Sequence, residues 1–227
     1  MNSRVHLSIL ILGAAGALAL VIAGAASSTQ HGDCPPNSTL QRVEITETEE
    51  RFVCRCNRGF FTRGQRCERA EAAARDAARR WREEVRAGRA TDCAALAGLI
   101  EEIGEGVYWN LDEMVRLVGG VVGGVRLRDV TLAPPAGETV AFGQSGFRPG
   151  YVDRATSDQV RHFIGYFALG AMLSGGAVAE IVAGWRDARE PGDYQLGIFA
   201  ANLGQRMRQS PELLRGVGGA IRSSICR

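Results

Sequence analysis

The stretch SDQVRHFIGYFALGAM, residues 157–172, decides the fold of this chain. Its residues are apolar on nearly every face of a helix, and such a helix belongs inside a domain. Beyond the Gly-containing break at 174–176, the segments 177–189 and 193–207 continue the helical pattern. The sequence therefore predicts a mainly α protein with these helices at the centre of a compact helical domain.

The rest of this domain, predicted to span 91–227, carries helix start signals. Thr91 or Asp92 is a candidate N-cap, and Asn110 followed by Glu113 forms a capping-box arrangement. Pro211 stands where a last helix begins. Between these helices, alternation on both sides of a Pro-Gly turn predicts a short β-hairpin within 125–142.

The sequence predicts a further helix at 68–90, ahead of this domain. Its apolar positions form one narrow stripe at helical spacing, made of Ala74, Ala77, Ala78, Trp81 and Val85. The remaining surface is charged and Arg-rich, which is typical of a solvated face. We expect a helical linker, or stalk, in front of the globular domain.

Six cysteines fall into two groups. Four crowd one short segment, and two stand far apart in the helical region: Cys34, Cys54, Cys56 and Cys67, then Cys93 and Cys226. An even number of cysteines in an exported chain favours disulfides. This partition is compatible with three bridges, although sequence alone does not prove the connectivity. A Cys93–Cys226 bridge would join the first helix of the domain to its last.

The segment 34–67 resembles the C-terminal part of an EGF-like module. The residues that carry the resemblance are Cys54-x-Cys56, the Gly59-Phe60 turn and Cys67. By that resemblance Cys34 would pair with Cys54, and Cys56 with Cys67. The first cysteine pair of a full module is missing. Independently of the resemblance, so small a segment needs disulfides because it cannot build a core.

The N-terminus is a targeting segment. Arg4 precedes an unbroken apolar run at 7–26, which fits either a cleaved signal peptide or an uncleaved membrane anchor. Either form sends the remainder outward, so the protein is predicted to be exported: secreted, periplasmic or anchored. A polar spacer at 27–33 follows, and membrane attachment through 7–26 is left open.

Composition excludes several function classes. All 27 basic residues are Arg, so chemistries that require a Lys, such as Schiff-base or kinase catalysis, are excluded. A net charge of +2 is too small to indicate nucleic acid as a partner. With three His and plausibly bridged cysteines, no zinc site is expected, and nothing in the sequence indicates another metal or a cofactor.

One group of residues could support acid–base chemistry. Asp158 and His162 are four residues apart and share a helical face, so the carboxylate could orient the imidazole as a general base. Arg161 would hold an anionic group, and Glu190 or Asn202 would assist. The alternative interpretation is that these residues cap the helix and pair with buried neighbours.

The pattern Asp158-x-x-Arg161-His162, Asp187-x-x-Glu190 and Asn202-x-Gly204 resembles an uncharacterised helical domain of bacterial secreted and toxin-associated proteins, over residues 157–207. The aromatic and amide residues expected after the His are absent. Two functions are therefore considered. The first is a non-enzymatic binding or structural module that contacts a surface or wall ligand. The second is a secreted hydrolase or toxin-like effector with His162 as general base.

Overall fold

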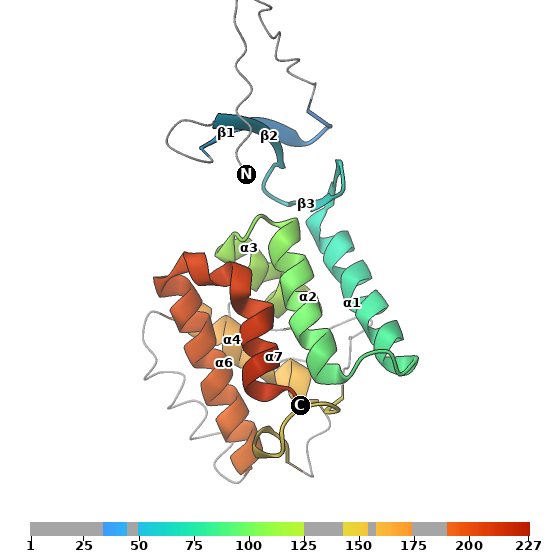
Figure 1. Ribbon diagram of the computed structural model, residues 1–227, viewed down its shortest axis with the longest axis vertical. Helices are drawn as coiled ribbons and strands as arrows, with labels where there is room; N and C mark the ends of the chain where they lie inside the picture. Colours follow the sequence, from blue (N-terminus) through green and yellow to red (C-terminus); the bar gives the residue numbers. More distant parts are fainter. Residues whose placement is uncertain (1–33, 45–49, 125–142, 154–157, 174–189) are drawn as a thin grey trace, which may run out of the picture. The chain divides into compact units, whose positions relative to one another are not determined.

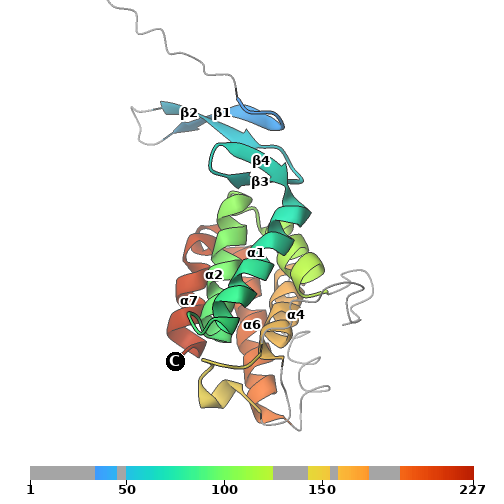
Figure 2. The same ribbon diagram turned by 90° about the vertical axis from the view of Figure 1, so that its right-hand side faces the viewer.

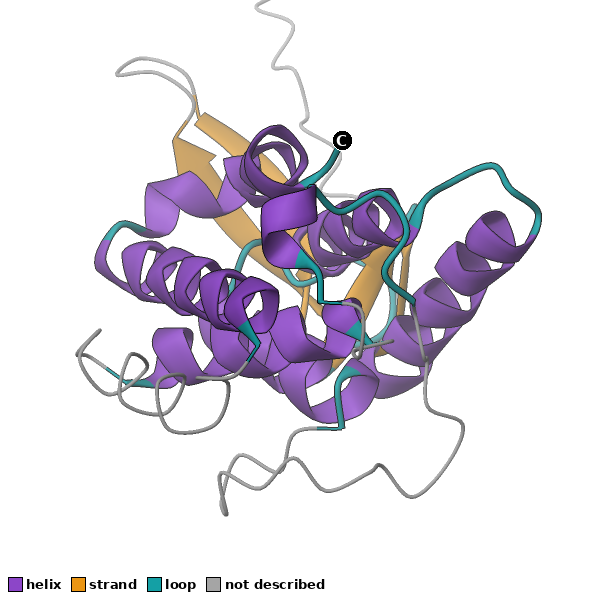
Figure 3. Ribbon diagram, turned by 90° about the horizontal axis from the view of Figure 1, so that it is seen from below, coloured by secondary structure: helices purple, strands orange, loops and turns teal. Residues whose placement is uncertain are grey.

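The computed structural model describes residues 34–44, 50–124, 143–153, 158–173 and 190–227 (Figure 1). All described residues belong to one compact unit, Cys34–Arg227. The predicted targeting segment, the spacer and the β-hairpin at 125–142 lie outside the described residues. Within the described part the protein is mainly α, and regular strands occur only ahead of the first helix (Figure 3).

The segment 34–67, called the disulfide knot below, contains two antiparallel β-hairpins. Strand β1 (Ser38–Glu44) pairs with β2 (Glu50–Cys56), and β3 (Phe60–Arg63) pairs with β4 (Arg66–Arg69). The second hairpin turns through Gly64, whose φ of +58° is one that glycine adopts without strain. β4 runs two residues beyond the knot and leads directly into the first helix.

All six cysteines are bridged. The pairs are Cys34–Cys54, Cys56–Cys67 and Cys93–Cys226. The pairing that the EGF-like resemblance implied for the knot and the predicted long-range bridge are both confirmed, whereas membership of an EGF-like family stays a prediction. Three intramolecular disulfides are characteristic of a chain that matures in an oxidising, non-cytoplasmic compartment.

Helix α1 (Ala70–Arg86) is more than the expected linker, because it packs along α2 (Asp92–Gly106), as Figure 2 shows. Its predicted stripe is the contact face: Ala74, Ala77 and Ala78 are fully buried, with Trp81 and Val85 partly buried beside them. Alanine side chains are short, so the two helices can approach closely. The segment is therefore part of the helical body, which we define as residues 70–227.

The helical body continues through α3 (Leu111–Val115) into a π-helix, η1 (Arg116–Val122). Thr91 and Asn110 cap α2 and α3 as expected, because their side-chain oxygens accept hydrogen bonds from Ala94 N and Glu113 N. The short 3-10 helix η2 (Pro149–Tyr151) leads on to α4 (Gln159–Met172).

The chain ends with α6 (Pro191–Gln209), the 3-10 helix η3 (Pro211–Gly216) and α7 (Val217–Ile225). Helices α4 and α6 lie side by side in Figures 1 and 2 and form the most extensive interface between any two described helices. An ideal Cβ on Gly170 would lie 2.0 Å from the carbonyl oxygen of Ala201. These two backbones can meet only because Gly170 has no side chain.

The core of the body is formed where α2 meets α7 on one side and where α4 meets α6 on another. Phe163 and Phe167 of α4 are fully buried, as the apolar stretch at 157–172 predicted. None of the described helices is both long and apolar enough to cross a membrane. The apolar segment 7–26 lies outside the described residues.

Candidate functional site

Asp158, the first of the predicted catalytic residues, is the N-cap of α4. Its Oδ1 accepts a hydrogen bond of 3.3 Å from the backbone N–H of Arg161. Burial raises the pKa of Asp158, while this hydrogen bond and the positive charges of Arg161 and His162 act in the opposite direction. The carboxylate thus serves the start of the helix, as the alternative interpretation expected.

His162 joins α4 to α6 through Asp193. Its Nε2 lies 2.8 Å from the backbone carbonyl oxygen of Asp193, and its Nδ1 lies 4.0 Å from the Asp193 carboxylate. The imidazole side chain is only 10% exposed, and its ring contacts Tyr166 at a centroid distance of 4.9 Å. Gly197 of α6 makes room for both rings, since a Cβ there would lie within 3.3 Å of each.

This geometry limits what the imidazole can do. A carbonyl oxygen only accepts hydrogen bonds, so Nε2 must carry the hydrogen in the bond to Asp193. In the neutral ring the nitrogen left to accept a proton is Nδ1, which faces the carboxylate of Asp193. A general base must reach the proton that it abstracts in a plausible substrate pose. The hydrogen bonding of His162 therefore suits a structural contact between two helices better than a role in acid–base catalysis.

Three of the remaining predicted residues lie in the described part of the chain, on α4 or α6 or at the start of α6. Glu190 is the N-cap of α6, and its backbone carbonyl accepts from Tyr194 N at 2.9 Å. Asn202 is exposed further along α6. Arg161 is half-buried at the start of α4, and Asp187 lies outside the described residues.

Sequence reasoning did not single out Gln159 or Asp153, two polar residues that contact Asp193. Gln159 is fully buried, and its amide donates a 2.6 Å hydrogen bond to Asp193, which is 3% exposed. Asp193 N in turn donates to Asp153 at 2.8 Å. Asp193 lies in the first turn of α6, and the N-cap residue Glu190 makes no side-chain capping hydrogen bond. The carboxylate of Asp193 reaches across to α4.

A second polar site lies where the disulfide knot meets the helical body, at Tyr108. The hydroxyl of Tyr108 donates to the carbonyl oxygen of Cys54 at 3.2 Å and accepts from Cys56 N at 3.4 Å. The guanidinium of Arg55 lies over the same ring, 5.3 Å from its centroid. One side chain of the body thus holds three consecutive residues of β2.

The backbone at this turn is unusual. Tyr108 and the following Trp109 have φ values of +51° and +58°. Left-handed conformations of non-glycine residues cost roughly 1–3 kcal/mol each and persist only where surrounding contacts hold them. Here Trp109 N donates to Gly104 O at 2.7 Å, and Asn110 N donates to Val107 O at 3.1 Å. The turn directs Tyr108 toward the knot.

One apolar contact reinforces this junction. Phe61 of β3 is 2% exposed. An ideal Cβ on Gly106, the last residue of α2, would lie 2.1 Å from atoms of the Phe61 ring. The ring therefore rests on the bare backbone at the end of α2. The sequence offered no signal for this contact beyond the glycine itself.

A cleft of about 300 Å³ opens at this junction. It is lined from both sides: the knot contributes Gln41, Arg55, Cys56, Asn57, Arg58, Gly59 and Phe60, and the body contributes Val107, Tyr108, Asn110, Asp112 and Glu113. A second, more open hollow is lined by Gln41, Arg42, Val43 and Arg55. The two share Gln41 and Arg55, so they form one continuous surface along β1 and β2.

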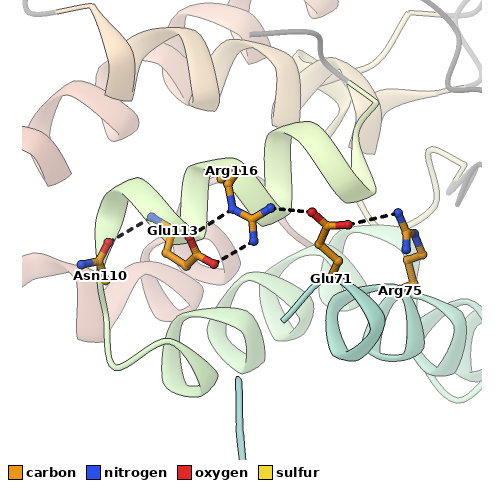
Figure 4. A network of polar contacts seen from close by, with 5 residues as sticks. All are labelled: Glu71, Arg75, Asn110, Glu113 and Arg116. Atoms are coloured by element: carbon orange, nitrogen blue, oxygen red, sulfur yellow. Dashed lines mark hydrogen bonds and ion pairs between the residues drawn. The ribbon is translucent and has the colours of Figure 1, made fainter. Parts of the chain in front are cut away.

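The carboxylates beside the cleft have cationic partners within the body. Glu113 binds Arg116 through two hydrogen bonds of 2.8 and 3.0 Å, and Arg116 also reaches Glu71 of α1, as Figure 4 shows. These contacts, led by the hydrogen bond that Arg116 donates to Glu113, raise the pKa of Arg116. Asp112 receives a 2.6 Å hydrogen bond from Arg208 of α6.

No protein-family model, curated protein or solved structure matches this chain. Within the described ranges, no three His, Cys, Asp or Glu side chains are placed to hold a metal ion. The site must therefore be assessed from its own geometry.

Proposed function

We propose that the protein is an exported bacterial surface module that works by binding rather than by catalysis. In this proposal the helical body is a rigid frame, and the cleft between knot and body is the binding surface. Residues 7–26 would tether the module to the membrane where they are retained. Export is supported by the three disulfides, which need an oxidising compartment.

The observation that carries the proposal is the Tyr108 junction. Two consecutive residues in a costly backbone conformation, and one hydroxyl bonded to both Cys54 and Cys56, hold the knot against the body. Strain of this kind gathers where a local geometry is needed for function. A polar cleft with walls from two differently built regions is a typical position for a binding site.

The alternative, a hydrolase or effector with His162 as general base, receives less support. His162 Nε2 is hydrogen-bonded to the Asp193 carbonyl, and Nδ1 faces the Asp193 carboxylate. Asp158, the residue expected to orient the imidazole, bonds the backbone N–H of Arg161.

His162→Ala and His162→Gln distinguish the two functions. If His162 is a structural contact between α4 and α6, Ala removes its hydrogen bond to the Asp193 carbonyl, and the free energy of unfolding should fall by about 1–3 kcal/mol. Gln keeps an N–H donor and should recover part of that loss. The measurement is urea unfolding followed by circular dichroism.

Chemical modification provides the second readout. In the native protein, diethylpyrocarbonate should modify His162 much more slowly than in the same protein in urea, because both ring nitrogens face α6. A His162→Ala variant with wild-type stability, together with a native His162 that reacts as fast as the unfolded one, would overturn the proposal and favour the enzyme.

A further inference from the structure

We propose that the continuous surface formed by the two hollows at the knot–body junction binds an extended acidic peptide through its carboxylates. The inference rests on the proposed binding function and adds the chemistry of the ligand. Three observations carry it: the balance of charges in the cleft, the fixed position of Arg55, and the length of the surface along β1.

The acidic and basic residues that line the cleft differ in whether they form ion pairs with described residues. Both acidic residues of the lining are engaged, Asp112 by Arg208 and Glu113 by Arg116. Among the described residues, by contrast, no carboxylate pairs with Arg55 or Arg58 of the lining. The internal pairs thus neutralise the anions and leave two cations, so the complementary ligand is an anion.

Arg55 is held in a position suited to carboxylate recognition. Its guanidinium stacks over the Tyr108 ring, and Tyr108 is itself fixed by two hydrogen bonds to β2. A guanidinium held by an aromatic face still presents the N–H groups at its edge, which match the two oxygens of a carboxylate. Little side-chain freedom would be lost on binding, which favours affinity.

The length of the surface distinguishes an extended chain from a single small anion. The two hollows meet at Gln41 and Arg55, and together they include the three consecutive residues 41–43 of β1. Three strand residues span roughly 10 Å at about 3.3 Å per residue, and the cleft extends the surface beyond Arg55 to Arg58. An extended peptide that lies across this surface would bring successive carboxylates to Arg55 and Arg58.

The test is a titration of the disulfide-bonded exported protein with a fluorescent hexa-aspartate peptide, followed by anisotropy. Hexa-asparagine of the same length is the neutral control. We expect saturable binding of the acidic peptide, weakening as salt is added, and no binding of the neutral one. Polygalacturonate and inorganic phosphate are titrated in parallel as carboxylate and anion sources without a peptide backbone.

Matched variants locate the site. Arg55→Gln and Arg58→Gln should each weaken binding by about tenfold or more, the loss typical of a charge-assisted hydrogen bond. Arg215→Gln, which removes an exposed Arg of η3, carries the same charge change and should bind like the wild type. Arg58 does not stack on Tyr108, so Arg58→Gln removes a charge of the cleft without removing that contact. Weaker binding of this variant therefore cannot be attributed to loss of the Arg55–Tyr108 stack.

Several results would overturn the inference. Equal weakening by Arg215→Gln would indicate non-specific attraction to a basic surface. Tighter binding of polygalacturonate or phosphate than of the peptide would reject a peptide ligand. Binding of no anion at all would reject the ligand class, but the His162 experiments would be unaffected, so a failure here and a failure of the proposed function can be told apart.

Discussion

The disulfide knot and the helical body achieve a fixed structure by different means. In the described residues of the knot, Phe61 is the only buried hydrophobic side chain, whereas the body buries several dozen. The knot has two disulfides within 34 residues, and the body has one that joins residues 133 positions apart. Covalent bonds thus replace a core in the knot and supplement one in the body.

This difference is consistent with the position of the proposed binding surface. The core of the body determines its backbone, so Tyr108 and Trp109 can be held in a strained turn. The knot has no comparable core and instead presents polar side chains, including Arg55 and Arg58, on a cross-linked hairpin. In the cleft between them, the helical body provides a rigid wall and the knot provides a polar wall.

The largest expected effect comes from the long-range disulfide. Replacing Cys93 and Cys226 together by Ala frees a loop of 133 residues and should lower the free energy of unfolding of the body by about 2–5 kcal/mol. The matched control removes Cys34 and Cys54 in the knot. That change should loosen the knot locally and shift helix melting much less, because the helical core is untouched.

Thermal melting at 222 nm follows the helices, and hydrogen exchange of β1 and β2 follows the knot. Equal loss of helix stability in the two double variants would show that the regions unfold as one unit, and would end the distinction between them.

The next effect tests the close contact of α4 and α6. Gly170→Ala places a methyl group where the Ala201 carbonyl already lies, and should destabilise the body by about 1–3 kcal/mol. Gly219→Ala on α7 meets no atom within 4 Å and should be neutral or stabilising by up to about 1 kcal/mol. Urea unfolding of both variants makes the comparison. Similar effects would mean that helix propensity, rather than packing, controls this part of the body.

The smallest effect concerns pH. Burial raises the pKa of Asp158 above its usual 3.8, despite the Arg161 N–H bond and the nearby positive charges. The folded protein thus holds this proton more tightly than the unfolded chain. The stabilising contribution of Asp158 is therefore full at pH below its unfolded pKa and is lost as pH rises through the folded pKa.

Asp158→Asn keeps a capping oxygen but does not titrate in this range. Relative to wild type, its stability should therefore improve as pH rises from below 3.8 to neutrality. Asp158→Ala loses the cap at every pH and should cost about 1 kcal/mol. Unfolding curves across this pH range make the measurement, and an Asn variant that instead loses stability relative to wild type with rising pH contradicts the assigned direction.

Much of the local structure follows from short-range rules. Thr91 and Asn110 cap their helices as their side chains predict, and Pro211 begins a helix. Packing contacts do not follow from such rules. The rings of Trp109 and Phe61 lie against Gly104 and Gly106 at the end of α2, where an added Cβ would clash with them.

The side-chain contacts of the candidate site were harder to predict from the sequence. The four-residue spacing of Asp158 and His162 is correct for a shared helical face, but the partner that engages His162 is Asp193, on another helix. Which side chains meet across two helices depends on their relative rotation and separation, and single-sequence patterns do not contain that information. Tyr108 was missed for the same reason, since its partners lie 52 and 54 residues earlier in the chain.

The amino-acid sequence by itself determined the mainly α character, the two cysteine groups and the buried face of 157–172, because these depend on composition, spacing and the 3.6-residue period. Only the tertiary structure decided that α1 joins the helical body, that His162 meets Asp193, and that Tyr108 holds the knot beside a polar cleft. The physical reason is that hydrogen bonds within one helical turn are local, whereas these contacts exist only once the helices have packed.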